Sequence, residues 1–206
     1  MVSRIYVEKK SGFDVEAQQL AHELRTILGI EALTGLRLVN RYDAEGIAPD
    51  LFDSCVPTVF SEPQSDIATR ALPEAAGATV LAVEPLPGQF DQRAESASEC
   101  VQLISQGERP VVRTAKVYLL EGALSDADIE AVKRYVINPV EAREASLEER
   151  ATLELEQPDP ENVEVVSGFC ELDEAALAAF VSARGLAMDL ADAPCRASWG
   201  LSSPSS

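Results

Sequence analysis

The sequence predicts an α+β fold in which two similar strand-helix-strand units form a mainly antiparallel sheet with the helices on one face. Val7-Glu8, a glycine turn and Phe13-Asp14 recur as Val83-Glu84, a glycine turn and Phe90-Asp91. In both places an amphipathic run and then a β-rich run follow. One such unit alone buries little apolar surface, so we expect two half-sheets packed about a pseudo-twofold axis.

The first copy is expected to open with a short strand around Ile5 and Val7. Asp14 is a natural N-cap for the next helix, and Gly29 is expected to end it. One face of this helix carries apolar side chains at spacings of three and four, namely Ala17, Leu20, Ala21, Leu24, Ile27 and Leu28. The second strand is expected over 36–42, and we align it with 115–121 of the second copy.

A proline-rich connector, 47–78, is expected to hold one or two short helices around a brief extended piece at 58–60. The second copy then opens with a strand over 79–83 and continues, after its helix, with a strand over 111–120. Cys100 is expected to be a small buried hydrophobe of that helix. The apolar face of the helix is made by Ala94, Ala97, Val101 and Ile104.

A third helix is announced by Ser125-Asp126-Ala127-Asp128, which has the pattern of a capping box. Asn138-Pro139 ends it, because the residue before a proline avoids the helical region. Its apolar face consists of Ile129, Val132 and Val136.

An acidic linker follows, in which Arg143 and Arg150 are far outnumbered by carboxylates up to Glu174. One helix is expected there, with Leu172 stapled onto Leu177, Asp173 as its N-cap and Gly185 at its end. The sequence therefore predicts three parts: a duplicated domain over 1–145, a linker domain over 146–192 and an irregular tail over 193–206.

Composition excludes several functional classes. The chain has 206 residues, 46% of them hydrophobic, which supports a real core, and its net charge is -18. Such acidity argues against electrostatic binding of nucleic acid or anionic membranes. No apolar stretch approaches the length of a membrane span, and the start lacks the apolar region of a signal peptide, so we expect a cytosolic protein. The cysteines are too widely spaced for a CxxC motif and are expected to be reduced thiols: Cys55, Cys100, Cys170 and Cys195.

The search for catalytic motifs predicts no catalytic residue, no cofactor site and no metal site in this chain. The single histidine, His22, is expected to face water. One histidine and scattered cysteines exclude self-contained zinc sites and Cys-His or Ser-His-Asp mechanisms. Neither GxxxxGK[ST] nor GxGxxG occurs, so no phosphate-binding loop is visible.

Two polar clusters are candidates for contact with another protein surface. In the first, Asp91 is explained by N-capping alone, whereas Arg93 opposes the helix dipole unless a partner compensates it. Interface function and simple capping both stay open there. In the second, Arg41 and Tyr42 could reach a docked surface, although an exposed strand end is the preferred interpretation. The candidate interface residues are Gln89, Asp91, Gln92, Arg93, Arg41 and Tyr42.

Several separated motifs, in order, resemble one known family. They are Val7-Glu8-Lys9-Lys10, Gly12-Phe13-Asp14-Val15-Glu16-Ala17, Asn40-Arg41-Tyr42-Asp43, Leu86-Pro87-Gly88-Gln89-Phe90-Asp91-Gln92-Arg93-Ala94, Ala115-Lys116-Val117-Tyr118 and Ile137-Asn138-Pro139-Val140. Together they resemble the amino-terminal region of single-chain phosphoribosylformylglycinamidine synthase, over about residues 1–191 of this chain. The resemblance implies a PurS-like, ferredoxin-like domain similar to a fused dimer of the small PurS subunit, followed by a linker domain.

The resemblance also implies a function. The family is a carbon-nitrogen ligase of de novo purine biosynthesis, which uses ATP, magnesium and ammonia released from glutamine by its glutaminase domain. Its catalytic residues lie in the synthetase and glutaminase domains, so this chain would be a non-catalytic fragment that bridges those two partners. Its end, Pro194-Cys195-Arg196-Ala197-Ser198-Trp199 and a serine-rich tail, differs from the family's histidine-containing continuation and suggests a truncated product or fragment.

Two other interpretations stay open. A free-standing ferredoxin-like module could bind a small effector or self-associate through its sheet face. The chain could also be a nonfunctional remnant of a broken gene, which shares every structural prediction with the bridging fragment.

Overall fold

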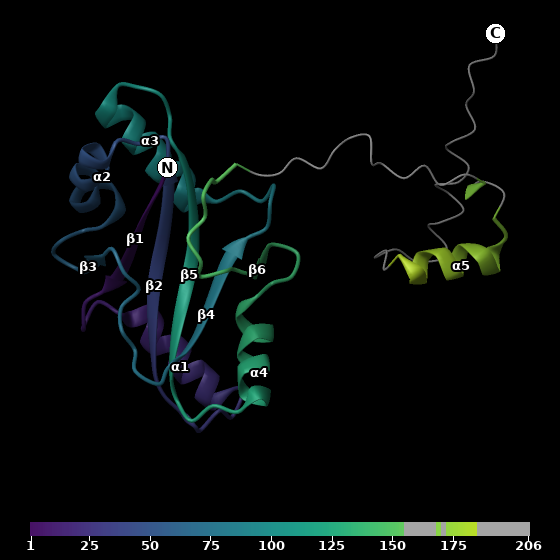
Figure 1. Ribbon diagram of the computed structural model, residues 1–206. Coiled ribbons are helices and arrows are strands. Elements are labelled where there is room, and N and C mark those ends of the chain that lie inside the picture. Colours follow the sequence, from purple (N-terminus) through teal and green to yellow (C-terminus); the bar gives the residue numbers. More distant parts are fainter. Residues whose placement is uncertain (155–167, 170–171, 185–206) are drawn as a thin grey trace, which may run out of the picture. The chain divides into compact units, whose positions relative to one another are not determined.

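The computed structural model describes residues 1–154, 168–169 and 172–184 (Figure 1). The chain divides into two compact units, Met1–Leu155 and Glu156–Ser206, which are considered separately. This division falls about ten residues after the boundary expected at 145. The expected tail over 193–206, the helix end at Gly185, and Cys170 and Cys195 lie outside the described residues.

The first unit is an α+β structure with a six-stranded antiparallel sheet in the order β3-β1-β2-β5-β4-β6. The strands are β1 (Val2–Lys9), β2 (Leu33–Glu45), β3 (Asp66–Thr69), β4 (Thr79–Pro85), β5 (Val111–Gly122) and β6 (Ala142–Glu144). The helices are α1 (Val15–Thr26), α2 (Pro49–Cys55), the π-helical turn η1 (Val56–Phe60), α3 (Gln92–Ser105) and α4 (Asp126–Val136). The predicted α+β class and antiparallel sheet are confirmed, and the arrangement is compatible with a ferredoxin-like fold.

One straight row of residues crosses the four inner strands. Val7 on β1 pairs with Asn40 on β2, Asn40 pairs with Lys116 on β5, and Lys116 pairs with Val83 on β4. The two ends of the row correspond: Val7 of β1 pairs with Asn40 of β2 in the same way as Val83 of β4 pairs with Lys116 of β5. We call residues that occupy the same place in these two halves of the ladder register-equivalent.

The register corrects one expectation from the sequence, the alignment of 36–42 with 115–121. Leu36 packs with the helices, whereas Ala115 lies in the cluster on the opposite face. Side chains alternate between the faces of a strand, so an alignment that exchanges the faces is wrong. In the observed ladder Tyr42 pairs with Ile5, and Tyr118 pairs with Leu81, which makes the two tyrosines register-equivalent.

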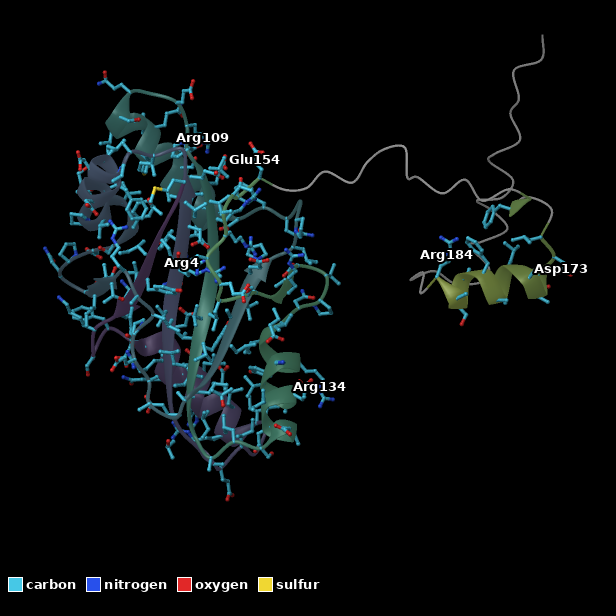
Figure 2. All side chains as sticks on the ribbon, in the orientation of Figure 1. Arg4, Arg109, Arg134, Glu154, Asp173 and Arg184 are labelled. Carbon is cyan, nitrogen blue, oxygen red and sulfur yellow. The ribbon has the colours of Figure 1, made fainter. Side chains whose placement is uncertain are left out.

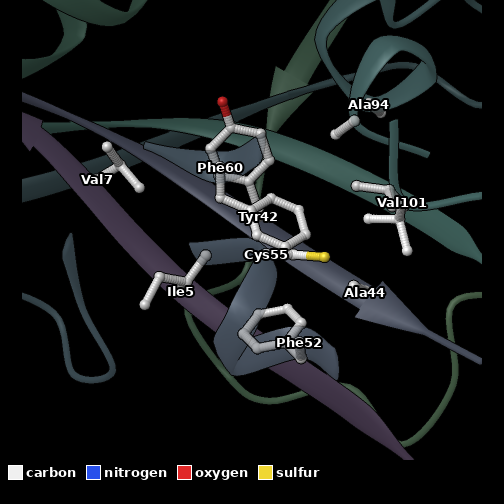
Figure 3. Packing of buried hydrophobic residues seen from close by; sticks show 11 residues of the cluster. Ile5, Val7, Tyr42, Ala44, Phe52, Cys55, Phe60, Ala94 and Val101 are labelled. Atoms are coloured by element: carbon white, nitrogen blue, oxygen red, sulfur yellow. The ribbon is translucent and has the colours of Figure 1, made fainter. Parts of the chain in front are cut away.

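The helices cover one face of the sheet, as expected, and they form two groups. Figure 1 shows α2 and α3 near one end of the sheet and α1 and α4 near the other. Under α2 and α3, the ring of Phe60 lies 5.0 Å from that of Phe52 and 5.3 Å from that of Tyr42 (Figure 3). Under α1 and α4, the fully buried core includes Leu24 and Val132. Burial of each such side chain contributes on the order of 2 kcal/mol.

The opposite face is covered by loops rather than helices. Val39 and Val117 are buried there, and the chain segment 145–153, which we call the strap, runs across them. The strap is fastened at its start by a hydrogen bond from the Ala145 amide to the Ala82 carbonyl, 2.8 Å long. At its other end Leu153 is 2% exposed, and its amide donates to the Glu45 carboxylate at 2.7 Å. Residues 145–153 therefore pack against the sheet, although the sequence suggested a linker after Arg143.

The helix ends follow the predicted residues in most cases. Ser125 and Asp128 form the expected capping box at the start of α4. In the second unit Asp173 accepts a hydrogen bond from the Ala176 amide and caps α5 (Glu174–Ala183). Gly29, with a φ of +68°, lies just beyond α1. Asp14 precedes α1 but makes no side-chain capping bond; it accepts from the Gly12 amide instead.

Two expectations about the connector and α3 are wrong. Residues 58–60 form part of a helical turn, because Phe60 is drawn into the core, and the extended piece is β3 at Asp66–Thr69. Cys100 is exposed. It precedes the buried Val101 by one position, which is about 100° around the helix, and therefore points away from the sheet.

Candidate functional site

A groove of about 530 Å³ opens on the helix-covered face between the two groups of helices. Its floor contains Asn40 from β2 and Thr114 and Lys116 from β5. These polar residues stand on the face of the sheet that is otherwise apolar, with Leu36 and Ala44 farther along β2 in the two hydrophobic clusters. The gap between the clusters is therefore the part of this face that is built for polar contact.

The floor of the groove is held on one side by α1. Lys116 Nζ lies 2.5 Å from Glu16 Oε1, in the first turn of that helix. The Glu16 side chain is 69% exposed and that of Lys116 33%, so solvent screens this ion pair and its contribution to stability is below about 1 kcal/mol. The pair can exchange partners with an incoming ligand at little cost.

Asp91 joins the start of α3 to β5. Its carboxylate accepts a hydrogen bond from the Ala94 amide at 3.0 Å, which caps the helix. The other oxygen accepts from the Thr114 amide at 3.1 Å and from the Thr114 hydroxyl at 2.8 Å. These bonds satisfy polar groups of β5 just before Lys116, the first residue of β5 that pairs with β4. Capping is thus observed for Asp91, and its interface role stays a prediction.

Arg93 finds the partner that its position near a helix start requires. Arg93 Nη1 donates to the Tyr42 hydroxyl at 3.3 Å, so the structure brings together one residue from each predicted polar cluster. Desolvation lowers the pKa of Arg93, but the hydrogen bond to Tyr42 and the nearby carboxylates of Glu16 and Asp91 outweigh it and raise the pKa. The guanidinium stays charged at the rim of the groove.

The remaining residues of this cluster lie at the rim. Gln89 donates through Nε2 to the Val140 carbonyl at 3.2 Å, and Gln92 is exposed in the first turn of α3. Phe90, between Gln89 and Asp91, is 76% exposed.

Arg41 and Tyr42 are not an exposed strand end, so that expectation is wrong. Arg41 is 1% exposed and Tyr42 is 5% exposed. The reason is that β2 extends to Glu45 and is paired on both sides, with β1 and β5. Tyr42 reaches the groove through its hydroxyl, whereas Arg41 lies on the opposite face under the strap. Interface contact by either residue stays a prediction.

That opposite face carries a buried ionic network which the sequence interpretation missed. Arg4 Nε and Nη2 donate to the two carboxylate oxygens of Asp43, at 2.5 and 3.1 Å. Arg41 Nε lies 3.2 Å from the same carboxylate, and its Nη1 donates to the strap carbonyl of Ser146 at 2.6 Å. Arg4 also donates to the strap, to the Leu147 carbonyl at 2.8 Å. Figure 2 shows Arg4 over the sheet, away from Arg134 on α4.

Glu84 extends this network toward the edge of the sheet. Its Oε1 lies 2.8 Å from Arg143 Nη2 and its Oε2 lies 2.6 Å from Arg150 Nη2. Burial raises the pKa of Glu84, but the hydrogen bonds from Arg150 and Arg143 outweigh it, so its pKa is lowered. Burial lowers the pKa of Arg41, partly offset by Asp43. The one sequence signal was the charged pair Arg41 and Asp43, two residues apart on one face of a central strand.

The groove is suited to binding. Tyr118 is a buried residue that lines the groove. Burial, together with the nearby Glu16 carboxylate, raises the pKa of Tyr118 to about 12, so its phenol stays protonated at neutral pH. Within the described residues no three or more His, Cys, Asp and Glu side chains gather where they could hold a metal ion. His22 is exposed on α1, as predicted.

No protein-family model matches the chain, and no curated protein matches it. None of the helices in the described part of the chain has the length and apolar character needed to cross a lipid bilayer.

Proposed function

We propose that this chain is the non-catalytic amino-terminal region of a single-chain phosphoribosylformylglycinamidine synthase, which holds the synthetase and glutaminase domains of that enzyme together. The proposal starts from the ordered motifs that resemble this family, among them Asn40-Arg41-Tyr42-Asp43 and Ile137-Asn138-Pro139-Val140. ATP, magnesium and glutamine would be used by the partner domains, in the cytosol, and this chain would contribute surface.

The observation that carries the proposal is the symmetric row across the sheet. Val7 meets Asn40 as Val83 meets Lys116, and the two halves join at the Asn40–Lys116 pair. Each half also contains a strand, a helix, a strand, helical structure and a short outer strand, in that order. This is the arrangement expected of a duplicated unit, that is, of two small PurS-like subunits fused into one chain.

The exposed aromatic residues support a docking role for the helix-covered face. Phe90 is 76% exposed and Phe13 is 57% exposed, each in the turn before the first helix of its half. Aromatic side chains are enriched where protein surfaces meet, because they bury a large area with little loss of side-chain entropy. A bridge between two catalytic domains needs such a surface.

The test is reconstitution in trans. A synthase that lacks this region is mixed with the chain, and amidine formation is measured with glutamine and, separately, with ammonium as the nitrogen source. We expect the chain to restore glutamine-dependent turnover, because bridging affects transfer between the catalytic domains. A folded chain that restores nothing would contradict the proposal.

A matched pair of variants connects the result to the groove rim. Phe90→Ser is expected to weaken reconstitution by at least roughly tenfold, since truncating a central aromatic anchor costs about 2 kcal/mol. Leu103→Ser is the control: Leu103 is 77% exposed on α3, is not among the groove-lining residues, and leaves the rim intact. Equal losses in both variants would argue against contact through the rim.

A second candidate function is a free-standing module that binds a small effector. The groove volume of about 530 Å³ favours it, and the lining offers cationic groups, Arg93 and Lys116, together with the carboxylates of Glu84, Asp91 and Glu141. A ligand that binds only the folded state raises the melting temperature. A clear shift with ATP, glutamine or another metabolite, combined with no reconstitution, would favour this candidate over the bridge.

A further inference from the structure

Arg113 differs from the other arginines around the strap because no carboxylate among the described residues forms an ion pair with it. It stands on the loop-covered face of β5, opposite Asp43. Asp43 is occupied by Arg4 and Arg41. Arg113 Nε is buried and makes no hydrogen bond with any part of the chain that the structure describes. A buried guanidinium nitrogen without a partner loses hydration that nothing repays, which points to a ligand.

The register-equivalent arginine in the other half shows what kind of ligand fits. Arg37 lies three residues before Asn40, as Arg113 lies three residues before Lys116. Arg37 Nε and Nη2 donate to the two carboxylate oxygens of Glu8, both at 2.6 Å. Glu8 on β1 and Glu84 on β4 are register-equivalent as well, since each follows the valine of the central row.

In the second half the equivalent carboxylate, that of Glu84, is bound by other arginines. Glu8 pairs across the ladder with Ile67 on β3, whereas Glu84 pairs with Arg143 on β6. An arginine therefore replaces an apolar side chain beside the glutamate, and Arg143 with Arg150 takes both oxygens of Glu84. Arg113 Nε is thereby left without an acceptor in the part of the chain that the structure describes.

The space beside Arg113 has matching size and charge. A cavity of about 30 Å³ is lined by Arg113, Arg143 and Arg150, with Glu84 and Asp91 as its carboxylates. Glu84 is held by Arg143 and Arg150, and Asp91 caps α3 and binds Thr114. The cavity admits a small group of a few atoms and is too small for a nucleotide.

We propose that Arg113, flanked by Arg143 and Arg150, is a binding site for a single carboxylate group supplied from outside the chain. The guanidinium of Arg113 binds it through Nε and one terminal nitrogen, as Arg37 binds Glu8. The flanking guanidiniums add positive charge without giving up Glu84. Arg113 stands on the loop-covered face, although the cavity shares Gln89 and Asp91 with the lining of the groove. The proposal does not depend on the proposed function.

The test follows the Nε–Hε correlation of Arg113 by NMR of the full chain, labelled with ¹⁵N, during titration with sodium acetate. We expect a saturable downfield shift of this proton, because charge-assisted hydrogen bonds are short and strong. The signal of Arg37, already bound to Glu8, is the internal control and stays in place. A titration with sodium chloride at equal ionic strength is expected to leave both signals unmoved. An Arg113 signal that does not saturate with acetate, or that moves equally with chloride, would overturn the proposal.

The variant Arg143→Ile gives the second half the residue that the first half has at this place. It frees Oε1 of Glu84 to accept from Arg113, so the Arg113 signal is expected to shift without acetate and acetate binding to weaken by at least roughly tenfold. Arg134→Ile is the control, because Arg134 is exposed on α4, and this variant is expected to retain acetate binding. Undiminished acetate binding in Arg143→Ile, with its amide spectrum showing a folded chain, would count against the site.

Acidic side chains of a bound protein and carboxylic-acid metabolites both present this group, and a third titration separates them. L-glutamate that binds more tightly than acetate identifies a metabolite that uses further contacts. L-glutamate that binds no more tightly than acetate identifies the carboxylate alone as the recognised group, as for a partner's side chain. Inorganic phosphate that binds more tightly than either would overturn the carboxylate assignment.

Discussion

Asn40 and Lys116 lie directly opposite each other on β2 and β5, at the midpoint of the row that joins Val7 to Val83. They are the polar pair at the seam between two hydrophobic clusters, one under α2 and α3 and the other under α1 and α4. The core of this unit is therefore divided where its two halves meet. Several consequences of that organisation can be measured.

Asp91→Ala is expected to destabilise the protein by about 2 kcal/mol, because it removes the cap of α3 and the acceptor of Thr114 together. Asp14→Ala is the matched control at the start of α1, where the carboxylate makes no capping bond, and it should cost less than about 0.5 kcal/mol. Urea unfolding followed by circular dichroism measures both. Equal losses would show that the clamp to Thr114 contributes nothing.

Asp43→Asn should be far more damaging than a change at a surface ion pair. It leaves Arg4 and Arg41 without their shared carboxylate in a buried place, for which about 3 kcal/mol or more is expected. Glu16→Gln, which breaks the exposed pair with Lys116, should stay below about 1 kcal/mol. The free energies of unfolding of the two variants, from the same denaturation experiment, give the comparison. A loss of less than about 1 kcal/mol in Asp43→Asn would mean that water reaches the network and screens its charges.

The network also predicts how stability depends on pH. Because the pKa of Glu84 is lowered on folding from its usual 4.5, the unfolded chain binds more protons in that range. The stabilisation from Glu84 is present above the unfolded pKa and is lost as the pH falls through the folded pKa. Glu84→Gln should therefore flatten the acid limb of a plot of unfolding free energy against pH. A variant with the same slope as the parent below pH 4.5 would refute this assignment.

Removal of the strap tests where the first unit ends. A chain that stops after Leu155 should retain the amide spectrum of the sheet, since the compact unit is complete there. A chain that stops after Glu144 loses the carbonyls that accept from Arg4 and Arg41 and should be less stable by several kcal/mol. Equal melting temperatures would place the boundary at the earlier position.

The two described cysteines should react with thiol reagents at different rates. Cys100 is exposed, whereas Cys55 is buried and its pKa is raised by burial. Peptide mapping after brief alkylation of the native protein should find Cys100 modified at least roughly tenfold faster, because the accessible thiolate is the reactive form. Prior unfolding should remove the difference. Equal rates in the native protein would contradict the packing of Cys55 in the core.

Local patterns in the sequence were enough to predict much of the fold. Alternating side chains place β2 and β5, and the capping box at Ser125 places the start of α4, because both signals depend on neighbours in the chain. The turn at η1 does not follow from local pattern, since Phe60 is fixed by packing against Phe52 and Tyr42 rather than by its own propensity for strand.

The candidate sites were harder to predict because they depend on pairing between distant strands. The cluster around Asp91 and Arg93 was visible as a turn before a helix, but its link to Tyr42 follows from strand order. The environment of Arg113 could not be read from the sequence. It depends on the register that sets Arg143 beside Glu84, and a shift of one residue in that register would place the arginine on the other face.

Both margins of the sheet finish in very short strands, β3 with four residues and β6 with three. Such brief outer strands give another polypeptide too few free backbone groups to extend the sheet by hydrogen bonding. Growth into strand-paired dimers or fibrils at these two margins is thereby discouraged.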